Sequence, residues 1–274
     1  MKKKLILVTG ASAGIGKATA LQLIKEGHIV YGAARRLEKM KELQDAGGFA
    51  LKMDVLENGQ IEAGIKHMVD EHGKIDVLVN NAGYAIYGAV EDITIDEARR
   101  QFEVNIFGLA RLTQLVLPHM RTQQSGTIIN ISSVGGKIFT PLGAWYHATK
   151  HALEGWSDCL RIEVEPFGIN VVIVEPGAIK TEFVDVMNQP MLDRSANGPY
   201  EGLAKAMAKT AAESYSKKGR HSGPEVIANT ISKAIKSRKP KTRYASGAMA
   251  GMVLFMRRWL SDRGFQKMIM SQIK

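Results

Sequence analysis

The chain alternates short apolar, β-branched runs with longer segments of helical periodicity, and this alternation constrains its fold more than any other feature. Strands that alternate with helices are typical of a parallel sheet covered by helices on both faces. Strands are expected at residues 5–8, 29–33, 49–54, 75–79, 127–132 and 169–175, with a seventh at 241–245, and helices at 16–26, 37–45, 59–71, 95–120 and 144–165. The sequence therefore predicts an α/β, doubly wound fold with a mostly parallel sheet of six or seven strands.

The length of 274 residues suits one large domain, and no linker or internal repeat divides the chain. Residues 181–223 break the rhythm, because Pro190, Gly198 and Pro199 punctuate a stretch without any strand pattern. This stretch leaves the carboxyl end of the sixth predicted strand, the edge where doubly wound folds bind ligands. We expect one domain over residues 1–274, with a substrate lid at about 181–223 and a basic C-terminal segment at 224–274.

The distribution of charge argues against nucleic acid as a partner. The net charge is +10, but residues 217–274 hold 14 Lys and Arg and only two acidic residues. The excess is local rather than spread over the chain. The basic run 233–243, followed by the apolar run 248–256, leaves open a peripheral contact with a membrane surface or an acidic partner. The alternative is a solvated helix face beside a final core helix, with its methionines filling the core.

Cysteine usage and the length of the apolar runs favour a cytoplasmic protein. Cys159 is the single cysteine and cannot form an internal disulfide. The apolar runs at 5–8 and 248–256 are too short for a signal sequence or a membrane-spanning helix. No metal is expected, because His147 and His151 lack an intervening Glu and a third ligand.

A glycine-rich turn follows the first predicted strand and leads directly into a helix. Residues 9–16 read Thr-Gly-Ala-Ser-Ala-Gly-Ile-Gly. Free N–H groups at a helix N-terminus, and the absence of side chains, let a pyrophosphate approach the backbone. Because a second strand–helix unit follows, we expect a dinucleotide site that includes Thr9, Gly10, Ser12, Gly14 and Gly16.

The end of the second predicted strand indicates which nicotinamide cofactor fits. This strand is followed by Arg35 and Arg36, with no acid before Glu38. An acid here usually bonds the ribose 2′-hydroxyl of NAD, whereas arginine accommodates the 2′-phosphate of NADP. We therefore expect NADP. Asp54, at the end of the third predicted strand, is placed to meet the adenine amine.

Three polar motifs then occur at strand ends and at the start of a helix: Asn80-Asn81-Ala82-Gly83, Ser132-Ser133 and Tyr146-x-x-x-Lys150. The i,i+4 spacing puts Tyr146 and Lys150 on one helix face. A cation beside a phenol favours the phenolate, so Lys150 is expected to lower the pKa of Tyr146 toward the working pH. The pair then suits proton exchange with an alcohol or a carbonyl.

Together these motifs resemble the short-chain dehydrogenase/reductase family over about two-thirds of the chain, from residue 4 to residue 183, and within it the hydroxysteroid and retinol dehydrogenase branch. The resemblance implies a Rossmann fold and the catalytic residues Asn105, Ser133, Tyr146 and Lys150. Ser133 is chosen over Ser132 by the thirteen-residue step to the tyrosine. By this resemblance, Ser133 and Tyr146 hold the substrate oxygen and Tyr146 donates the proton. Lys150 bonds the nicotinamide ribose, and Asn105 holds a water that links Lys150 to solvent.

The resemblance also implies further cofactor contacts and an oligomer. The contacts are Ile15 and Gly16 at the pyrophosphate, Asp54 and Val55 near adenine, Asn81 and Ala82 along the adenosine ribose, Lys150 at the nicotinamide ribose, and Pro176, Gly177, Ile179 and Thr181 near the carboxamide and phosphates. Gly83 and Tyr146 are also expected to contact the cofactor. Arg35 matches a basic position of NADP-preferring members, while a second such position is Ala13 here. Family members are usually dimers or tetramers, so a homodimer or homotetramer is expected.

Apolar residues near the catalytic motif and in the lid predict the kind of substrate. They are Val134, Ile138, Phe139, Leu142, Trp145, Phe183, Met187, Met191 and Leu192. We expect an NADP-dependent oxidoreductase that interconverts an alcohol and a ketone or aldehyde on a steroid, a retinoid or a lipid-like molecule. The same residues would equally pack the lid against the core. The alternatives are an NADPH-binding regulatory or membrane-surface protein with little turnover, and a reductase of acyl thioesters.

Overall fold

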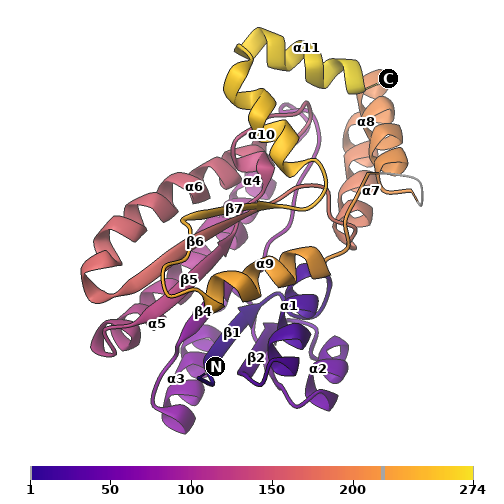
Figure 1. Ribbon diagram of the computed structural model, residues 1–274. Coiled ribbons are helices and arrows are strands. Elements are labelled where there is room, and N and C mark those ends of the chain that lie inside the picture. Colours follow the sequence, from indigo (N-terminus) through magenta and orange to yellow (C-terminus); the bar gives the residue numbers. More distant parts are fainter. Residues whose placement is uncertain (1, 217–219, 274) are drawn as a thin grey trace.

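The computed structural model describes residues 2–216 and 220–273 and, within them, every side chain except those of residues 183–186. Its centre is a parallel sheet of seven strands in the order β3-β2-β1-β4-β5-β6-β7 (Figure 1). The strands are β1 (Leu5–Thr9), β2 (Ile29–Ala34), β3 (Phe49–Lys52), β4 (Val77–Asn80), β5 (Gly126–Ile131), β6 (Ile169–Pro176) and β7 (Arg243–Ser246). The chain reverses its direction of growth between β1 and β4, which creates a crevice at their carboxyl ends. The predicted doubly wound parallel sheet is confirmed.

Two hydrophobic cores lie on opposite faces of this sheet. One core joins the sheet to α1 (Gly14–Lys25), α2 (Lys41–Asp45) and α9 (Glu225–Lys236). The other joins it to α3 (Asn58–His72), α5 (Leu109–Thr122) and α6 (Ala144–Val164). Because strand side chains alternate between faces, Ile6 and Val8 enter the first core, whereas Leu5 and Leu7 enter the second. This explains why the strand sequences are apolar at nearly every position.

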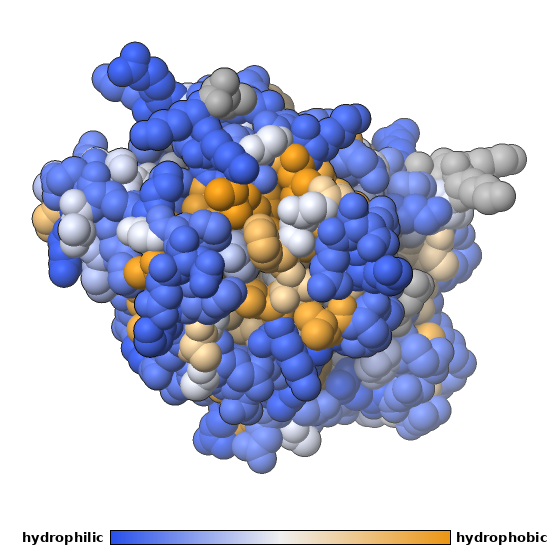
Figure 2. Space-filling model, turned by 90° about the horizontal axis from the view of Figure 1, so that it is seen from below, coloured by the Kyte–Doolittle hydropathy of each residue, from blue (hydrophilic) through white to orange (hydrophobic). Residues whose placement is uncertain are grey.

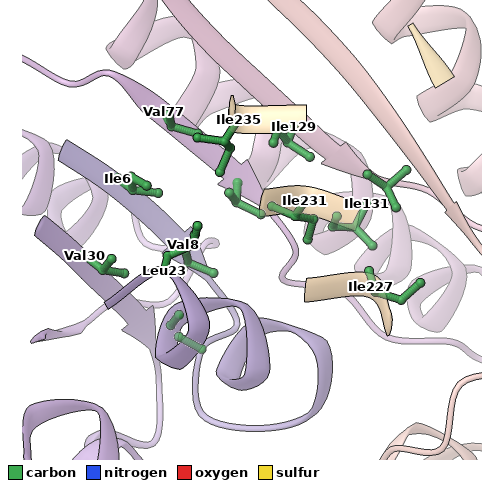
Figure 3. Close-up of a cluster of buried hydrophobic side chains, with 14 of the residues drawn as sticks. Ile6, Val8, Leu23, Val30, Val77, Ile129, Ile131, Ile227, Ile231 and Ile235 are labelled. Carbon is green, nitrogen blue, oxygen red and sulfur yellow. The ribbon is translucent and has the colours of Figure 1, made fainter. Parts of the chain in front are cut away.

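Figure 3 shows the first core, in which α9 lies across the sheet. Ile227, Ile231 and Ile235 follow one another at intervals of four residues and point toward Ile129 and Ile131 of β5 (Figure 3). The face seen from below, by contrast, is largely hydrophilic, with apolar residues mainly near its middle (Figure 2).

The segment predicted as one helix over 95–120 is divided into three parts. Helix α4 (Ile95–Phe102) begins with a capping box in which Thr94 and Glu97 bond each other's backbone N–H groups. A π-helical turn, η2 (Glu103–Gly108), follows and carries Asn105, and α5 then continues to Thr122. Single π-turns are frequent at functional sites, and local propensity does not predict them.

The interruption at 181–223 contains two helices, α7 (Phe183–Ser195) and α8 (Glu201–Ser214), packed against each other. The excursion closes at its base, because the Lys180 N–H donates to Ser222 O at 2.9 Å and the Ser222 N–H donates to Ala178 O at 3.0 Å. The predicted lid therefore leaves the sheet and returns to it at one point. Its residues Lys217, Lys218 and Gly219 lie outside the described residues, as do Met1 and Lys274.

After β7 the chain forms α10 (Ala250–Trp259) and α11 (Asp262–Gln272). The expectation of a final core helix here is wrong. Ala250 is the one residue of α10 that is buried. Met252 and Met270 are each 42% exposed, and Met256 and Met268 are half-buried, so none of these four methionines fills the core. The reason is topological: β7 is the edge strand, and the chain leaves it upward, away from both cores (Figure 1). Within the described residues, no helix combines the length and the apolar character needed to cross a bilayer.

Candidate active site

The glycines of the turn between β1 and α1 stand where a side chain would be too close to neighbouring atoms. A Cβ added to Gly16 would lie 2.3 Å from Gly10 O, and Gly10 and Gly14 both have positive φ angles, of 67° and 53°. Helix α1 begins at Gly14, and the residue before it, Ala13, provides no side-chain cap. The first N–H groups of α1 therefore remain available to an anion, which fits the pyrophosphate of a dinucleotide.

This turn is tied to the end of β4 by hydrogen bonds. The Thr9 hydroxyl accepts the N–H groups of Asn81 and Ala82, both at 3.0 Å, and the Asn81 side-chain amide donates to Thr9 O at 2.9 Å. The amide group of Asn81, which the resemblance places along the ribose, thus holds the turn together. Gly83 follows at the point where an added Cβ would approach Asn105 Oδ1 to 3.1 Å.

Basic side chains gather beside the turn at the end of β2. The Arg36 guanidinium lies 3.4 Å from the Ser12 hydroxyl and 3.4 Å from a Glu182 carboxylate oxygen, and Arg35 is exposed next to it. Lys39 Nζ lies 3.7 Å from the other oxygen of Glu182. Lys39 was not among the basic side chains predicted from the sequence. Its position three residues after Arg36, on the short helical turn 37–40, could have indicated that the two lie close together.

The remaining predicted cofactor residues surround the same crevice. Asp54 accepts the Leu56 N–H at 3.1 Å, and Val55 packs against Gly108 of the π-turn. Pro176 ends β6, the Gly177 N–H donates to Ser246 O at 2.9 Å, and Ile179 is buried in the first core. The methyl group of Thr181 lies against the turn, 3.1 Å from where a Cβ of Gly14 would be, and Ile15 packs on the first core.

Gly16→Ala is expected to weaken dinucleotide binding at least about tenfold and to lower the free energy of unfolding, because the new Cβ overlaps Gly10 O and must push the turn apart. The matched control is Gly59→Ala in α3, where an added Cβ meets no atom within 4 Å and should be neutral or slightly stabilising. Isothermal titration with NADPH and thermal melting check both variants. Equal cofactor affinity in the two would contradict this account of the turn.

Tyr146, the tyrosine predicted to be catalytic, lies in the first turn of α6, beside the segment that follows β5. The Tyr146 side chain is 8% exposed. Burial raises the pKa of Tyr146 to about 12, and its hydrogen bond with Ser133 acts in the opposite direction. The Ser133 hydroxyl also accepts the Gly135 N–H at 3.0 Å, which fixes its orientation. Ser132, by contrast, is buried with no partner for its hydroxyl among the described residues.

Lys150 lies one helical turn further along α6 and is also buried. Its Nζ donates to Ile131 O at the end of β5, at 2.8 Å. Burial lowers the pKa of Lys150 to about 8, although the Glu154 carboxylate raises it. The expectation that Lys150 lowers the pKa of Tyr146 is wrong for this structure, because burial dominates at the phenol and the ammonium is turned toward the Ile131 carbonyl.

Asn105 connects the loop after β4 with α6. Its side-chain amide donates to Tyr84 O at 2.9 Å and to the Thr149 hydroxyl at 3.1 Å, and its carbonyl oxygen accepts the Tyr84 N–H at 3.1 Å. Thr149 is the residue before Lys150. The structure thus places Asn105 between the loop after β4 and helix α6, and its side chain bonds both.

His147 fixes the segment between Ser133 and Tyr146, a role the sequence did not reveal. Its Nδ1 lies 2.8 Å from Gly135 O, and its Nε2 lies 3.1 Å from the Thr140 backbone nitrogen. These partners require Nδ1 to carry the proton and Nε2 to accept, and burial lowers the pKa of this imidazole. Both ring nitrogens of His147 are therefore hydrogen-bonded to the segment between Ser133 and Tyr146.

Apolar side chains of the lid surround Tyr146. Tyr146, Tyr87 and Leu142 pack in one cluster with Met191 of α7 and Ala204 of α8, and Met187 and Leu192 join it. Other residues predicted to line the pocket lie elsewhere. Trp145 packs with Phe102 of α4, and Phe139 packs against Phe265 of α11. The side chain of Phe183 lies outside the described residues.

Comparisons with known proteins agree with this geometry. A family model for short chain dehydrogenases matches residues 4–191. The chain is 37% identical over 271 residues to the 3-ketodihydrosphingosine reductase of Bacteroides thetaiotaomicron, covering 97% of this chain and 96% of the relative. It is 32% identical over 268 residues to the uncharacterized oxidoreductase YbbO of Escherichia coli K12, covering 97% and 94%.

Solved structures give the same result. A short-chain dehydrogenase from Streptomyces avermitilis superposes with a TM-score of 0.77 at 36% identity, covering 93% of this chain and 91% of that one. A serine dehydrogenase complexed with NADP+ superposes with a TM-score of 0.76 at 27% identity, covering 87% and 92%. The chain therefore belongs to the short-chain dehydrogenase/reductase family, whose oxidoreductases use nicotinamide cofactors.

Proposed function

We propose that this protein is an NADP-dependent reductase of an apolar, lipid-like ketone, with Tyr146 as the proton donor. The observation that carries the proposal is a buried, neutral tyrosine beneath an apolar lid. A phenol that is protonated at neutral pH and lies beside the Ser133 hydroxyl has a proton to give to the oxygen of a carbonyl substrate.

The chain's own residues divide the work of this reaction. The nicotinamide, when bound, supplies the hydride to the carbonyl carbon. The Ser133 hydroxyl and the Tyr146 phenol hold the carbonyl oxygen, and the phenol gives its proton to that oxygen as the negative charge develops. The Lys150 ammonium, which is held by the Ile131 carbonyl, bonds the nicotinamide ribose when the cofactor is present. Asn105 keeps the catalytic helix in register with the loop after β4.

Two observations support a lipid-like ketone. The cluster around Tyr146 is apolar on both its core side and its lid side, which suits a substrate with few polar groups. The Bacteroides relative, named as a 3-ketodihydrosphingosine reductase, aligns over almost the whole of both chains. A long-chain lipid ketone is therefore the first substrate to test, ahead of steroids, retinoids and acyl thioesters.

Replacing Arg35 and Arg36 together with Ala should lower kcat/KM for NADPH by at least about tenfold and leave kcat/KM for NADH nearly unchanged. The double substitution removes charge-assisted hydrogen bonds to the 2′-phosphate, which NADPH carries and NADH lacks. The matched control is Lys41→Ala, a nearby exposed cation that pairs with Asp45 at 3.2 Å. Steady-state rates with both cofactors check the prediction. A parallel loss with NADH and NADPH would remove the basis for assigning the 2′-phosphate to these arginines.

We further propose a cytoplasmic homodimer or homotetramer whose subunits meet through α6 and α4. An exposed apolar groove of about 280 Å³ lies between these helices, and Ile95, Phe107 and Trp145 line it. Ile162, farther along α6, is also exposed. Apolar residues in this arrangement suit a contact between copies.

A further inference from the structure

The solvent-facing side of α10 is apolar. Met252, Phe255 and Trp259 are 42%, 64% and 71% exposed, and their spacing of three and four residues puts them on one side of the helix. Leu260, at the end of α10, is also exposed. We call these four residues the apolar face of α10. Exposed aromatic and aliphatic residues gathered in this way usually mark a surface that meets another apolar phase.

Helices α10 and α11 carry an excess of positive charge. Residues 250–273 contain four basic residues and one acid, and the acid, Asp262, pairs with Arg257 at 2.9 Å. Arg258, Arg263 and Lys267 are exposed and form no ion pair within the part of the chain that the structure describes. Two copies of such a surface would repel each other, whereas an anionic surface would be attracted.

The basic run at 233–243 is not part of this surface. It extends from the last turn of α9 to the first residue of β7, whereas α10 follows the carboxyl end of β7. Two cations of this run are also neutralised, since Lys236 pairs with Glu26 at 2.9 Å and Arg243 pairs with Asp158 at 2.6 Å. The combined basic and apolar surface expected from the sequence is therefore divided between two ends of the sheet.

Helices α10 and α11 lie on the side of the active site. The Phe265 ring of α11 packs edge-on against Phe139, in the segment between Ser133 and Tyr146, with ring centroids 5.3 Å apart. At its other end, α11 meets the lid, where the Thr210 hydroxyl of α8 donates to Gln272 O at 3.3 Å. Figure 1 shows α11 spanning from α10 to α8 above the sheet. Helix α11 thus connects the segment between Ser133 and Tyr146 to the lid helix α8.

We propose that the apolar face of α10 docks on the surface of an anionic lipid bilayer. The ten residues of α10 span about 15 Å, half the thickness of a hydrocarbon core, so the helix lies in the interface rather than across it. Phe255 and Trp259 enter the boundary between headgroups and acyl chains, and the exposed arginines and lysine attract the headgroups. This proposal rests on the proposed function: a bilayer that binds α10 would also bring a lipid-like ketone close to the lid.

The experiment is flotation of the full chain with vesicles of phosphatidylcholine, with and without phosphatidylglycerol, in the absence of substrate and cofactor. The wild type should float with the anionic vesicles and much less with the neutral ones, and added salt should weaken the binding. The double variant Phe255→Gln/Trp259→Gln should partition at least about tenfold less. Val90→Gln, at a 62% exposed residue in the loop before α4, is the matched control and should partition like the wild type.

Trp259 provides a second readout, because its emission should shift to shorter wavelength when anionic vesicles are added, and Trp259→Phe should abolish that shift. Wild type that stays in the bottom fraction with anionic vesicles, or a double variant that floats as well as the wild type, would overturn the proposal. So would sedimentation showing that the double substitution splits a wild-type oligomer, since a second copy would then cover the face. Flotation is measured without turnover, so failure of the lipid-ketone proposal and failure of docking are seen separately.

Discussion

Tyr146→Phe is expected to lower kcat/KM for ketone reduction by about a hundredfold to ten-thousandfold while leaving NADPH affinity within a few-fold of the wild type. The substitution removes one hydroxyl, which is the proton donor, and general acid catalysis contributes a factor of this size. The ring and its packing against the lid are kept, so the fold should be unaffected.

Tyr87→Phe is the matched control for this experiment. The Tyr87 ring centroid lies 5.9 Å from that of Tyr146, and burial likewise raises the pKa of its phenol. Because Tyr87 lies in the same cluster but has no part in the proposed proton transfer, its variant should retain most of the activity. Steady-state kinetics on both variants, with cofactor binding measured separately, distinguishes them. Comparable losses in Tyr87→Phe and Tyr146→Phe would point to lid packing rather than proton donation.

Lys150→Met is expected to abolish most turnover and yet to stabilise the fold at neutral pH. The buried ammonium has a pKa of about 8 in the folded protein against 10.5 for an ordinary lysine, a difference that corresponds to an unfavourable contribution of about 3 kcal/mol. Loss of the hydrogen bond to Ile131 O offsets part of the gain. We therefore expect the free energy of unfolding at pH 7 to rise by about 1–3 kcal/mol.

The pH dependence of this gain follows from the same values. The folded state binds the Lys150 proton more weakly than the unfolded state, so the penalty is complete below pH 8 and fades as the pH rises to 10.5. Denaturant unfolding at pH 7 and at pH 10 should show a gain for Lys150→Met that shrinks at the higher pH. Lys137→Met is the contrasting variant, because it removes a partner of buried Glu154, 2.9 Å away, and should destabilise. If the Lys150→Met protein is less stable than the wild type at pH 7, the claim that the buried Lys150 ammonium destabilises the fold is wrong.

The sequence predicted the elements that depend on local pattern. The strands were predicted from the alternation of apolar runs with helical segments, and the turn from the spacing of its glycines between a strand and a helix. The structure shows both close to their predicted ranges. The third strand ends at Lys52 rather than at Asp54, because the Asp54 side chain bonds the backbone N–H of Leu56 and bends the chain into α3.

The features that were missed depend on contacts between distant parts of the chain. The π-turn that carries Asn105 exists where the helix must fit both the loop after β3 and α6, which periodicity within 95–120 does not reveal. The pKa of Tyr146 is raised because the lid buries the phenol, and the lid residues that pack around it come about forty to sixty residues later in the chain. The exposure of α10 depends on the place of β7 at the edge of the sheet.

The measurement that tests the central claim most directly follows nicotinamide absorbance while the purified protein is mixed with NADPH and a long-chain lipid ketone, with Tyr146→Phe as the blank. Our account predicts that NADPH is consumed as the corresponding alcohol appears, that NADH supports a much lower kcat/KM, and that the blank is nearly inactive. NADPH that binds but is not consumed with the lipid ketone or with any of the steroids, retinoids and acyl thioesters, or equal use of NADH, would contradict it.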